Sequence, residues 1–235
     1  MLSEDALWNI SLMFLCYAYI VSMVFVSGRL SGLLSISVRM SRKILHMLIG
    51  NLPFIIPFFT SSFFPVAVAA PFILVTFCVS PYSPFRDLSK RLSGLAALTK
   101  EGHGLGLTFY SISYTSLALF FASKPHIIAA GILPMAYGDS AASIIGERFG
   151  KMKFKFLSYK SLEGSVAMFL ASFLSLSVGM VIFSSLLNMQ VYDWLAILTT
   201  ALSATLVELL SPHGSDDLFV PLASALTFLV VSGEV

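Results

Sequence analysis

Long apolar stretches, separated by shorter polar segments, make up most of this chain. The hydrocarbon core of a bilayer is about 30 Å thick, so a crossing helix needs about 20 mainly apolar residues. Eight stretches are candidate spans: 6–27, 44–61, 63–80, 105–123, 126–146, 162–187, 192–210 and 218–232. The second and third are short and closely joined and could form a hairpin that does not fully cross, so the range is seven to nine. The pattern predicts an all-α polytopic membrane protein with about eight transmembrane helices.

The composition supports this interpretation and excludes several classes of protein. Of the 235 residues, 57% are hydrophobic and 11% are charged, about half the charged share of an ordinary soluble domain. These values exclude a soluble globular domain, and a net charge of +2 gives no reason to expect a nucleic-acid partner. Cys16 and Cys78 match no metal spacing and are expected to be small buried hydrophobic residues. Glu4 and Asp5 precede the first stretch, which is therefore a span and not a signal peptide.

The basic residues are distributed among the loops in a way that predicts the orientation. With eight spans, the loops after the first, third and fifth lie on one side of the membrane, and they contain all of the 14 Lys and Arg residues except Lys124. The positive-inside rule makes that side cytoplasmic, so both termini are expected to be extracytoplasmic. In the longest loop an interfacial helix is expected near 85–98. Its apolar face against the headgroups would consist of Leu88, Leu92, Leu95 and Leu98.

Two polar clusters lie in the first half of the chain. Arg42, Lys43 and His46 enter the second span from the cytoplasm, and Arg42 and His46 share a helical face because they are four residues apart. A basic interfacial collar would account for the two cations but not for a histidine one turn deeper. The segment 100–106 has three glycines at alternate positions, which suits either a close backbone approach to a ligand or a flexible loop.

The third cluster surrounds Asp139, near the cytoplasmic end of the fifth span. Gly138, Ala142 and Gly146 form a stripe of small residues that lets a neighbouring helix pack closely. Asp139 lies about 10 Å inside that end, with no basic residue four positions away. A carboxylate at that depth needs a partner from another helix, a metal ion or a proton. A structural Asp bonded to hydroxyl groups is the alternative.

The fourth cluster opens the sixth span. Ser161 could cap this helix, and Gly164 continues a face of small residues. The free amides of the helix start, with Lys160 beside them, favour an anionic group such as a phosphate. Glu163 at the same end could instead simply satisfy the helix dipole.

The fifth cluster is acidic. Glu208 lies near the cytoplasmic end of the seventh span, and the loop after it contains Asp216 and Asp217 but neither Lys nor Arg. Carboxylates bind Mg²⁺, and Mg²⁺ binds phosphates, so an acidic loop facing three basic loops suits a bridging divalent cation and a nucleotide. An acidic turn with no chemical role is the alternative.

All five clusters lie at the cytoplasmic membrane face under this topology. A transport pathway would need polar groups near the midplane and on both sides, and the chain shows no internal repeat of the kind found in many transporters. A one-sided site fits an enzyme that takes an amphiphile from the bilayer and a charged cosubstrate from the cytosol.

The order of the clusters and their residue patterns resemble those of the polyprenol kinase family, which includes phytol, farnesol and dolichol kinases and a CTP-dependent diacylglycerol kinase. The Arg-Lys-x-x-His element corresponds to Arg42, Lys43 and His46. The Gly-Asp-x-x-Ala element and the glycine run after it correspond to Gly138, Asp139, Ala142, Gly146, Gly150 and Lys151. The Lys-Ser-x-Glu-Gly-Ser element corresponds to Lys160, Ser161, Glu163, Gly164 and Ser165. The last element corresponds to Glu208, Asp216, Val220 and Pro221, with Asp217 where Asn is frequent.

The resemblance covers about 41–222, which we take as the core of a single kinase domain spanning 1–235. The segment at Glu101 matches the family's Glu-Arg-Gly stretch only loosely, because Gly102 and His103 depart from it. The resemblance implies transfer of a γ-phosphoryl group from a nucleoside triphosphate, with CTP favoured over ATP, to the hydroxyl of a membrane isoprenoid alcohol. Mg²⁺ or a similar divalent cation is the expected cofactor.

Each candidate residue has an expected role in this reaction. The catalytic candidates are Asp139, His46 and Glu163. The phosphate-binding candidates are Arg42, Lys43, Lys151, Lys160, Ser161 and Gly164. The metal-binding candidates are Asp139, Glu163, Glu208, Asp216 and Asp217. A CTP-dependent lipid cytidylyltransferase and a small-solute transporter are the alternatives, and the sequence selects no oligomeric state.

Overall fold

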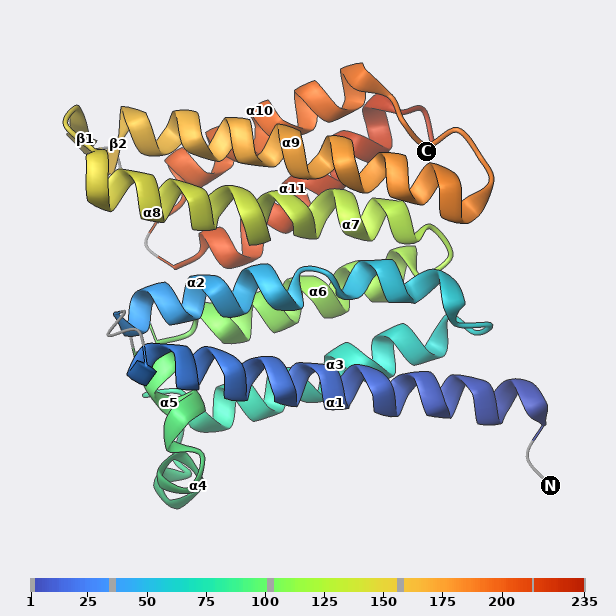
Figure 1. Cartoon of the computed structure of the whole chain (residues 1–235), viewed down its shortest axis with the longest axis horizontal. Helices are drawn as coiled ribbons and strands as arrows, with labels where there is room; N and C mark the ends of the chain where they lie inside the picture. Colours follow the sequence, from blue (N-terminus) through green and yellow to red (C-terminus); the bar gives the residue numbers. More distant parts are fainter. Residues whose placement is uncertain (1–2, 34–36, 101–103, 156–158, 213, 235) are drawn as a thin grey trace.

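The computed structural model describes residues 3–33, 37–100, 104–155, 159–212 and 214–234. Three residues of the polar clusters, Glu101, His103 and His213, lie outside the described residues. Helices dominate the fold (Figure 1). The first half contains α1 (Glu4–Leu33), α2 (Val38–Ile49), the 3₁₀ helix η1 (Leu52–Phe58), α3 (Phe63–Val79), α4 (Arg86–Arg91), α5 (Ser93–Lys100) and α6 (Gly106–Phe121). The second half contains α7 (Pro125–Leu133), the π-helix η2 (Pro134–Asp139), α8 (Ser140–Phe149), β1 (Lys153–Lys155), β2 (Tyr159–Ser161), α9 (Leu162–Leu187), α10 (Trp194–Leu210) and α11 (Asp216–Val231).

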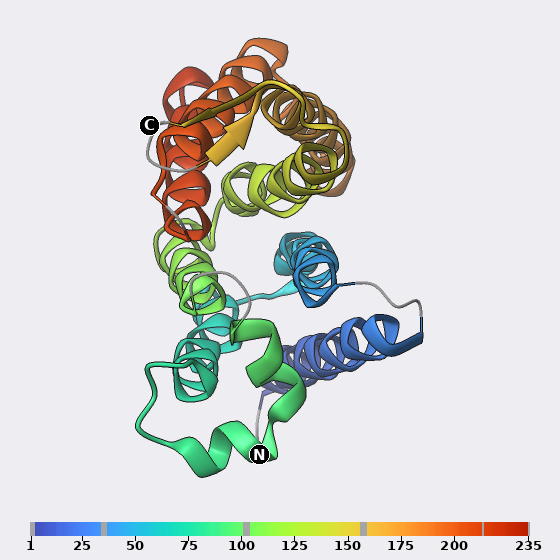
Figure 2. The ribbon, with the colours of Figure 1, turned by 90° about the vertical axis from the view of Figure 1, so that its left-hand side faces the viewer.

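The helices form two groups that follow the order of the chain. Seen end-on, the elements from α1 to α6 form one group, and those from α7 to α11 form the other (Figure 2). Both chain ends lie at one end of the molecule, and the β1–β2 hairpin and the α4–α5 segment lie at the opposite end (Figure 1). This arrangement agrees with the predicted even number of crossings, although the number of membrane spans and the side of each end stay predictions.

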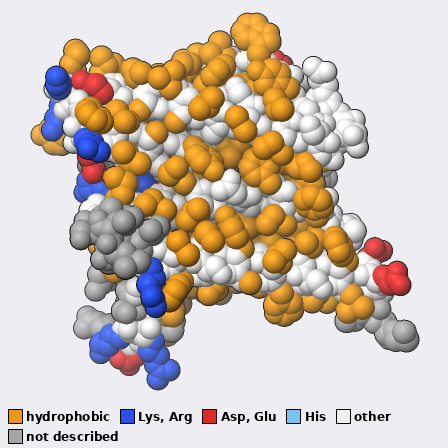
Figure 3. Space-filling view, viewed as in Figure 1, with side chains coloured by type: hydrophobic (Ala, Val, Ile, Leu, Met, Phe, Trp, Pro, Cys, Tyr) orange, Lys and Arg blue, Asp and Glu red, His pale blue; other side chains and the backbone are white. Residues whose placement is uncertain are grey.

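The outer surface has the apolar character of a membrane protein. Hydrophobic side chains cover the visible face between its two ends, and Lys and Arg side chains gather at the hairpin end (Figure 3). Among the described residues, three helical segments are long and apolar enough to cross a membrane: Glu4–Arg29, Pro125–Phe149 and Leu162–Leu187. On α9, Leu170, Leu174 and Val178 recur at four-residue spacing and are exposed, as expected for a face that contacts lipid.

The second predicted span, 44–61, is a broken helix and not a continuous one. Helix α2 ends at Ile49, and η1 follows with Pro53 near its start and Pro57 inside it. Proline lacks the amide that an α-helix requires, so the chain continues as a tighter 3₁₀ helix. At the break, a Cβ added to Gly50 would overlap the Ala136 side chain. The glycine therefore allows α2 to approach η2 closely.

Two expectations for the hairpin end of the molecule were wrong. The segment after α8 was expected to be a loop, but β1 and β2 pair antiparallel, with Phe154 opposite Lys160. The interfacial helix expected near 85–98 is divided into α4 and α5. Leu98 on α5 does not face headgroups, because it is buried in a small core with Leu45 and Leu107.

The stripe of small residues around Gly138 and Ala142 allows a neighbouring helix to pack closely, as the sequence predicted. A Cβ added to Gly138 would overlap the Ser172 hydroxyl on α9, and one added to Gly164 would lie 3.0 Å from the Ala142 carbonyl oxygen. Helices η2, α8 and α9 therefore pack with their backbones close together. This contact holds Asp139 and the start of α9 at fixed positions relative to each other.

Candidate active site

Helix α2 carries three charged or titratable side chains into the interior. The Ser37 side chain caps this helix by accepting a hydrogen bond from the Met40 amide. Arg42, Lys43 and His46 are all buried. An interfacial collar would leave its cations at the headgroups, so burial of all three residues contradicts the collar interpretation and favours a site inside the protein.

Asp139 receives its partner from another helix, which is one of the solutions that the sequence left open. Lys43 of α2 forms an ion pair with it, and both side chains are almost completely buried. Asp139 is the last residue of η2, which begins at Pro134. A π-helical turn changes the direction of the residues that follow it and is frequent at functional sites. The irregular turn therefore places Asp139 toward α2, where Lys43 neutralises it.

A second ion pair joins the hairpin to α10 and α11. Lys160 on β2 pairs with Glu208 on α10, and its Nζ lies 4.0 Å from Asp216 Oδ2 at the start of α11. Burial by itself would lower the pKa of Lys160, but the Glu208 and Asp216 carboxylates outweigh it and raise the pKa above the ordinary lysine value. The ammonium group therefore stays charged at the mouth of the site.

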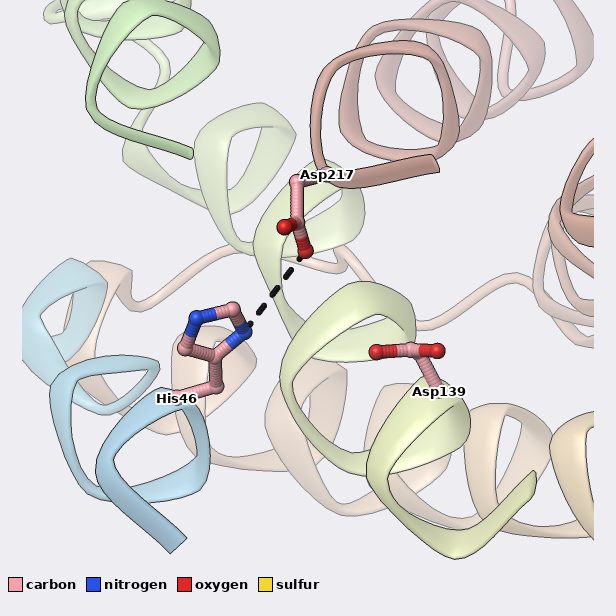
Figure 4. Close-up of side chains that lie close together, drawn as sticks. All are labelled: His46, Asp139 and Asp217. Carbon is pink, nitrogen blue, oxygen red and sulfur yellow. Dashed lines mark ion pairs between the residues drawn. The ribbon is translucent and has the colours of Figure 1, made fainter. Parts of the chain in front are cut away.

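A third group of side chains surrounds His46. The carboxylate of Asp217 points toward the imidazole (Figure 4), and its Oδ1 lies 3.7 Å from His46 Nδ1. Tyr110 on α6 stacks on the same ring, with centroids 4.8 Å apart and planes 10° from parallel. Both imidazole nitrogens and Asp217 Oδ1 are buried without a hydrogen-bond partner among the described residues. Buried polar atoms are normally paired with protein groups, water or a ligand, and this group of atoms is therefore a candidate point of contact for a bound molecule.

Asp139 connects these groups. Asp139 belongs to two sets of possible metal ligands, and in each set the ligand atoms lie within 4.8 Å of one another. One set is His46, Asp139 and Asp217, and the other is Asp139, Glu208 and Asp216. Carboxylate oxygens in such a cluster are the donors that Mg²⁺ prefers. The acidic set of Asp139, Glu208 and Asp216 therefore fits the predicted divalent cation by its chemistry and spacing.

Glycine makes space for this site on α6. A Cβ added to Gly106 would overlap Asp217 Oδ2 and lie 3.2 Å from Arg42 Nη1. Gly104 has φ of 74°, a conformation that other residues rarely adopt. The sequence left two interpretations of segment 100–106, a close approach of the backbone to a ligand or a flexible loop. At Gly106 the backbone does lie close to other groups, but these are the side chains of Asp217 and Arg42.

The remaining predicted site residues lie at its edge. Ser161 caps α9 by accepting a hydrogen bond from the Gly164 amide at 3.1 Å. Glu163 accepts hydrogen bonds from the amides of Lys151 and Met152, at 3.0 and 3.2 Å, and belongs to neither group of metal-ligand atoms. The first turn of α9 directs it to the hairpin, so the geometry does not support Glu163 as catalytic residue or metal ligand. The Lys151 side chain is exposed.

The sequence reasoning missed Tyr110 and Tyr114. Both line the interior face of α6, and Tyr114 makes an edge contact with Tyr110 at a centroid distance of 6.3 Å. A signal was available, because 106–121 lies in a predicted span and has an unusual number of hydroxyl side chains. In a bilayer such residues need an internal partner or a cavity.

The fold and the site define a helical membrane enzyme with a buried, charged centre suited to phosphate chemistry. The phytol kinase of Synechocystis sp. is 32% identical over 216 residues, which cover 90% of this chain and 88% of that protein. Probable phytol kinase 1, chloroplastic, of Glycine max is 33% identical over 198 residues, covering 79% of this chain and 64% of that protein. The chain belongs to the phytol kinase family of lipid-alcohol kinases.

A more distant relative agrees with this assignment. Phytol kinase 1, chloroplastic, of Arabidopsis thaliana is 28% identical over 207 residues, covering 80% of this chain and 64% of that protein. No protein-family model matches the chain. No solved structure matches it either.

Proposed function

We propose that this protein transfers the γ-phosphoryl group of a nucleoside triphosphate to the hydroxyl of an isoprenoid alcohol in the membrane. The observation that carries the proposal is that two ion pairs, Lys43–Asp139 and Lys160–Glu208, lie close to the imidazole of His46. Both nitrogens of this imidazole lack a hydrogen-bond partner among the described residues. Phosphoryl transfer requires cations for the phosphates, carboxylates for Mg²⁺ and an acceptor for the alcohol proton. The names of the relatives, phytol kinases in all three organisms, support an isoprenoid alcohol as the acceptor.

The two lysines are suited to bind the triphosphate. Lys43 and Lys160 are each paired with a carboxylate in the structure. Polyphosphate oxygens can replace a carboxylate as the partner of an ammonium group, because both carry negative charge and accept hydrogen bonds. Asp139, Glu208 and Asp216 would then hold Mg²⁺, which neutralises charge that develops on the phosphoryl oxygens. Arg42, buried beside Asp217, supplies a further positive charge next to this site.

His46 is the best-placed acceptor for the alcohol proton. Its nitrogens are free of hydrogen bonds to described residues, whereas Asp139 is already engaged by Lys43. In the proposed step the alcohol oxygen forms a bond to the γ-phosphorus and the bond to the β-phosphate oxygen breaks. The hydroxyl proton goes to His46, and the nucleoside diphosphate leaves. Asp217 faces Nδ1 and would orient the ring and stabilise the imidazolium.

The proposal also includes the identity of the phosphate donor and the side of the membrane on which the site lies. The resemblance to CTP-dependent lipid kinases favours CTP as phosphate donor. The positive-inside rule favours the cytoplasmic face for the site, because all the Lys and Arg residues except Lys124 belong to the three segments that the sequence assigns to one side of the membrane.

An assay of purified protein with Mg²⁺ and CTP or ATP labelled on either the α- or the γ-phosphate tests the proposal. The acceptors are phytol, geranylgeraniol, dolichol and diacylglycerol, each in detergent micelles. We expect γ-label, but not α-label, in a monophosphorylated isoprenoid alcohol. Transfer of α-label with release of pyrophosphate would identify a cytidylyltransferase instead. Absence of any labelled lipid with folded protein would overturn the kinase proposal.

A further inference from the structure

An apolar cavity lies beside the charged site, inside the first group of helices. It is bordered by α1, α2, α3 and α6, with Leu52 of η1 and Leu95 of α5 also in its lining. Its lining is almost wholly apolar and includes Val24, Leu45, Val68, Ala69 and Phe72.

The cavity has a site end and a deep end. On α6 it extends from Leu107 to Tyr114, and on α3 from Thr76 back to Val68. At 1.5 Å per residue these stretches are about 10–12 Å long. The hydroxyl of Thr99, next to the site end, donates to the Val79 carbonyl, so Thr76 lies toward the charged site and Ala69 lies far from it. The cavity is therefore elongated along the helices.

Tyr110 connects the cavity to the charged site. Its side chain lines the cavity, and its ring stacks on His46. The hydroxyls of Tyr110 and Tyr114 are buried without a hydrogen-bond partner among the described residues, and both residues are more than nine-tenths buried. The Tyr110 hydroxyl lies at the end of the cavity next to His46, where the hydroxyl of a ligand would satisfy it.

We infer that this cavity binds the isoprenoid chain of the acceptor alcohol, with the hydroxyl at the His46–Tyr110 end and the chain running toward Ala69. The inference rests on the proposed function and adds the place of the acceptor. A hydrocarbon chain matches the lining because it has no polar group to satisfy. A chain in this position presents its one hydroxyl to the imidazole and leaves the triphosphate on the side of Lys43 and Lys160.

The deep end provides a molecular ruler for the first test. Ala69→Phe fills the deep end, and the neighbouring Ala70→Phe adds the same bulk at a residue outside the lining. We expect Ala69→Phe to raise KM for C20 alcohols at least tenfold over wild type, while KM for the C5 alcohol prenol, which is too short to reach the deep end, changes less than twofold. Ala70→Phe should change neither value. Equal effects of the two variants, or an equal loss for both alcohols in folded Ala69→Phe, would overturn the inference.

A second test does not depend on activity or on the folding of a variant. Wild-type protein without nucleotide is irradiated with a C10 isoprenoid alcohol, about as long as the cavity, that carries a diazirine at the chain end remote from the hydroxyl. Mass spectrometry should find the label on deep-end residues such as Val68 and Ala69, and a tenfold excess of phytol should remove most of it. Label on the outward face of α9, for example at Leu174, or equal competition by phosphatidylcholine, would overturn the inference. Correct labelling without kinase activity would instead refute the proposed function alone.

Discussion

Clusters of acidic and basic side chains occur at both ends of this molecule, and the two clusters differ in how their members are paired. At the end with the chain termini, His126 Nε2 bonds both carboxylate oxygens of Glu234, at 2.8 and 2.7 Å, and Lys124 bonds the Glu234 carbonyl oxygen. One carboxylate there faces two basic side chains. At the hairpin end, four carboxylates, Asp139, Glu208, Asp216 and Asp217, lie among Arg42, Lys43, Lys160 and His46.

The difference separates a structural contact from a binding site. The Glu234 cluster ties the segment after α11 to the start of α7, and within the described part of the chain it contains one carboxylate only. The hairpin-end cluster combines α2, η2, β2, α10 and α11. It has four carboxylates against three Lys and Arg side chains, and an imidazole whose nitrogens have no hydrogen-bond partner among the described residues. Buried ion pairs are weak evidence for stability, so their concentration at a junction of five elements is better explained by function.

The largest expected effect comes from Asp139. We expect Asp139→Asn to lower kcat by about 10³-fold or more, because it removes a metal ligand and the charge that positions Lys43. Labelled-phosphate transfer with Mg²⁺ measures the loss, and size-exclusion chromatography and Tm verify folding. Glu234→Gln, the matched change at the opposite end, should retain wild-type kcat. Near-normal activity of folded Asp139→Asn would break the distinction between the two ends.

The two buried histidines give a second matched pair. His46→Gln should lower kcat by about 10²–10⁴-fold, the usual contribution of a general base, with little change in KM for the nucleotide. His126→Gln should leave kcat within twofold, because the hydrogen bonds of this imidazole to described residues go to the Glu234 side chain, at the end opposite the site. Steady-state kinetics at saturating alcohol distinguishes the two variants. Similar losses in both would show that His46 acts through packing.

The hairpin allows a third comparison within one end. Lys160→Gln should raise KM for the nucleotide about tenfold or more, because a charged contact to phosphate is lost. Lys153→Gln on the paired strand should have no such effect, since that side chain is exposed and its residue lies opposite Ser161. Initial rates over a range of nucleotide concentrations measure both. An unchanged nucleotide KM in Lys160→Gln would remove Lys160 from the phosphate site.

The smallest expected effect concerns the stability of the end with the termini. Glu234→Gln should lower the free energy of unfolding by no more than about 1 kcal/mol, the usual value for partly exposed pairs, since the Glu234 and Lys124 side chains are 24% and 41% exposed. Thermal unfolding in detergent, followed by intrinsic fluorescence, measures the change. A loss of several kcal/mol would show that this cluster is a main support of the fold.

Much of the architecture could be predicted because membrane helices obey local rules. Each predicted apolar stretch corresponds to a helix or a series of helices, and the excess of basic residues marks one end of the molecule. The break at Gly50 could not be predicted from hydropathy, because an apolar run does not distinguish an α-helix from a 3₁₀ helix. The β1–β2 hairpin is too short and too charged to produce a strand pattern.

The sequence alone determined that this is a helical membrane protein with its chemistry at one end, and it named most of the residues that meet there. Only the tertiary structure decided which charges pair, because Lys43 and Asp139 are 96 positions apart and Lys160 and Glu208 are 48 apart. It also separated Glu163 from the other predicted metal ligands, Asp139, Glu208, Asp216 and Asp217. Local patterns record burial and helix propensity, whereas partners are chosen by helix packing, in which small residues such as Gly106 and Gly138 set the distances.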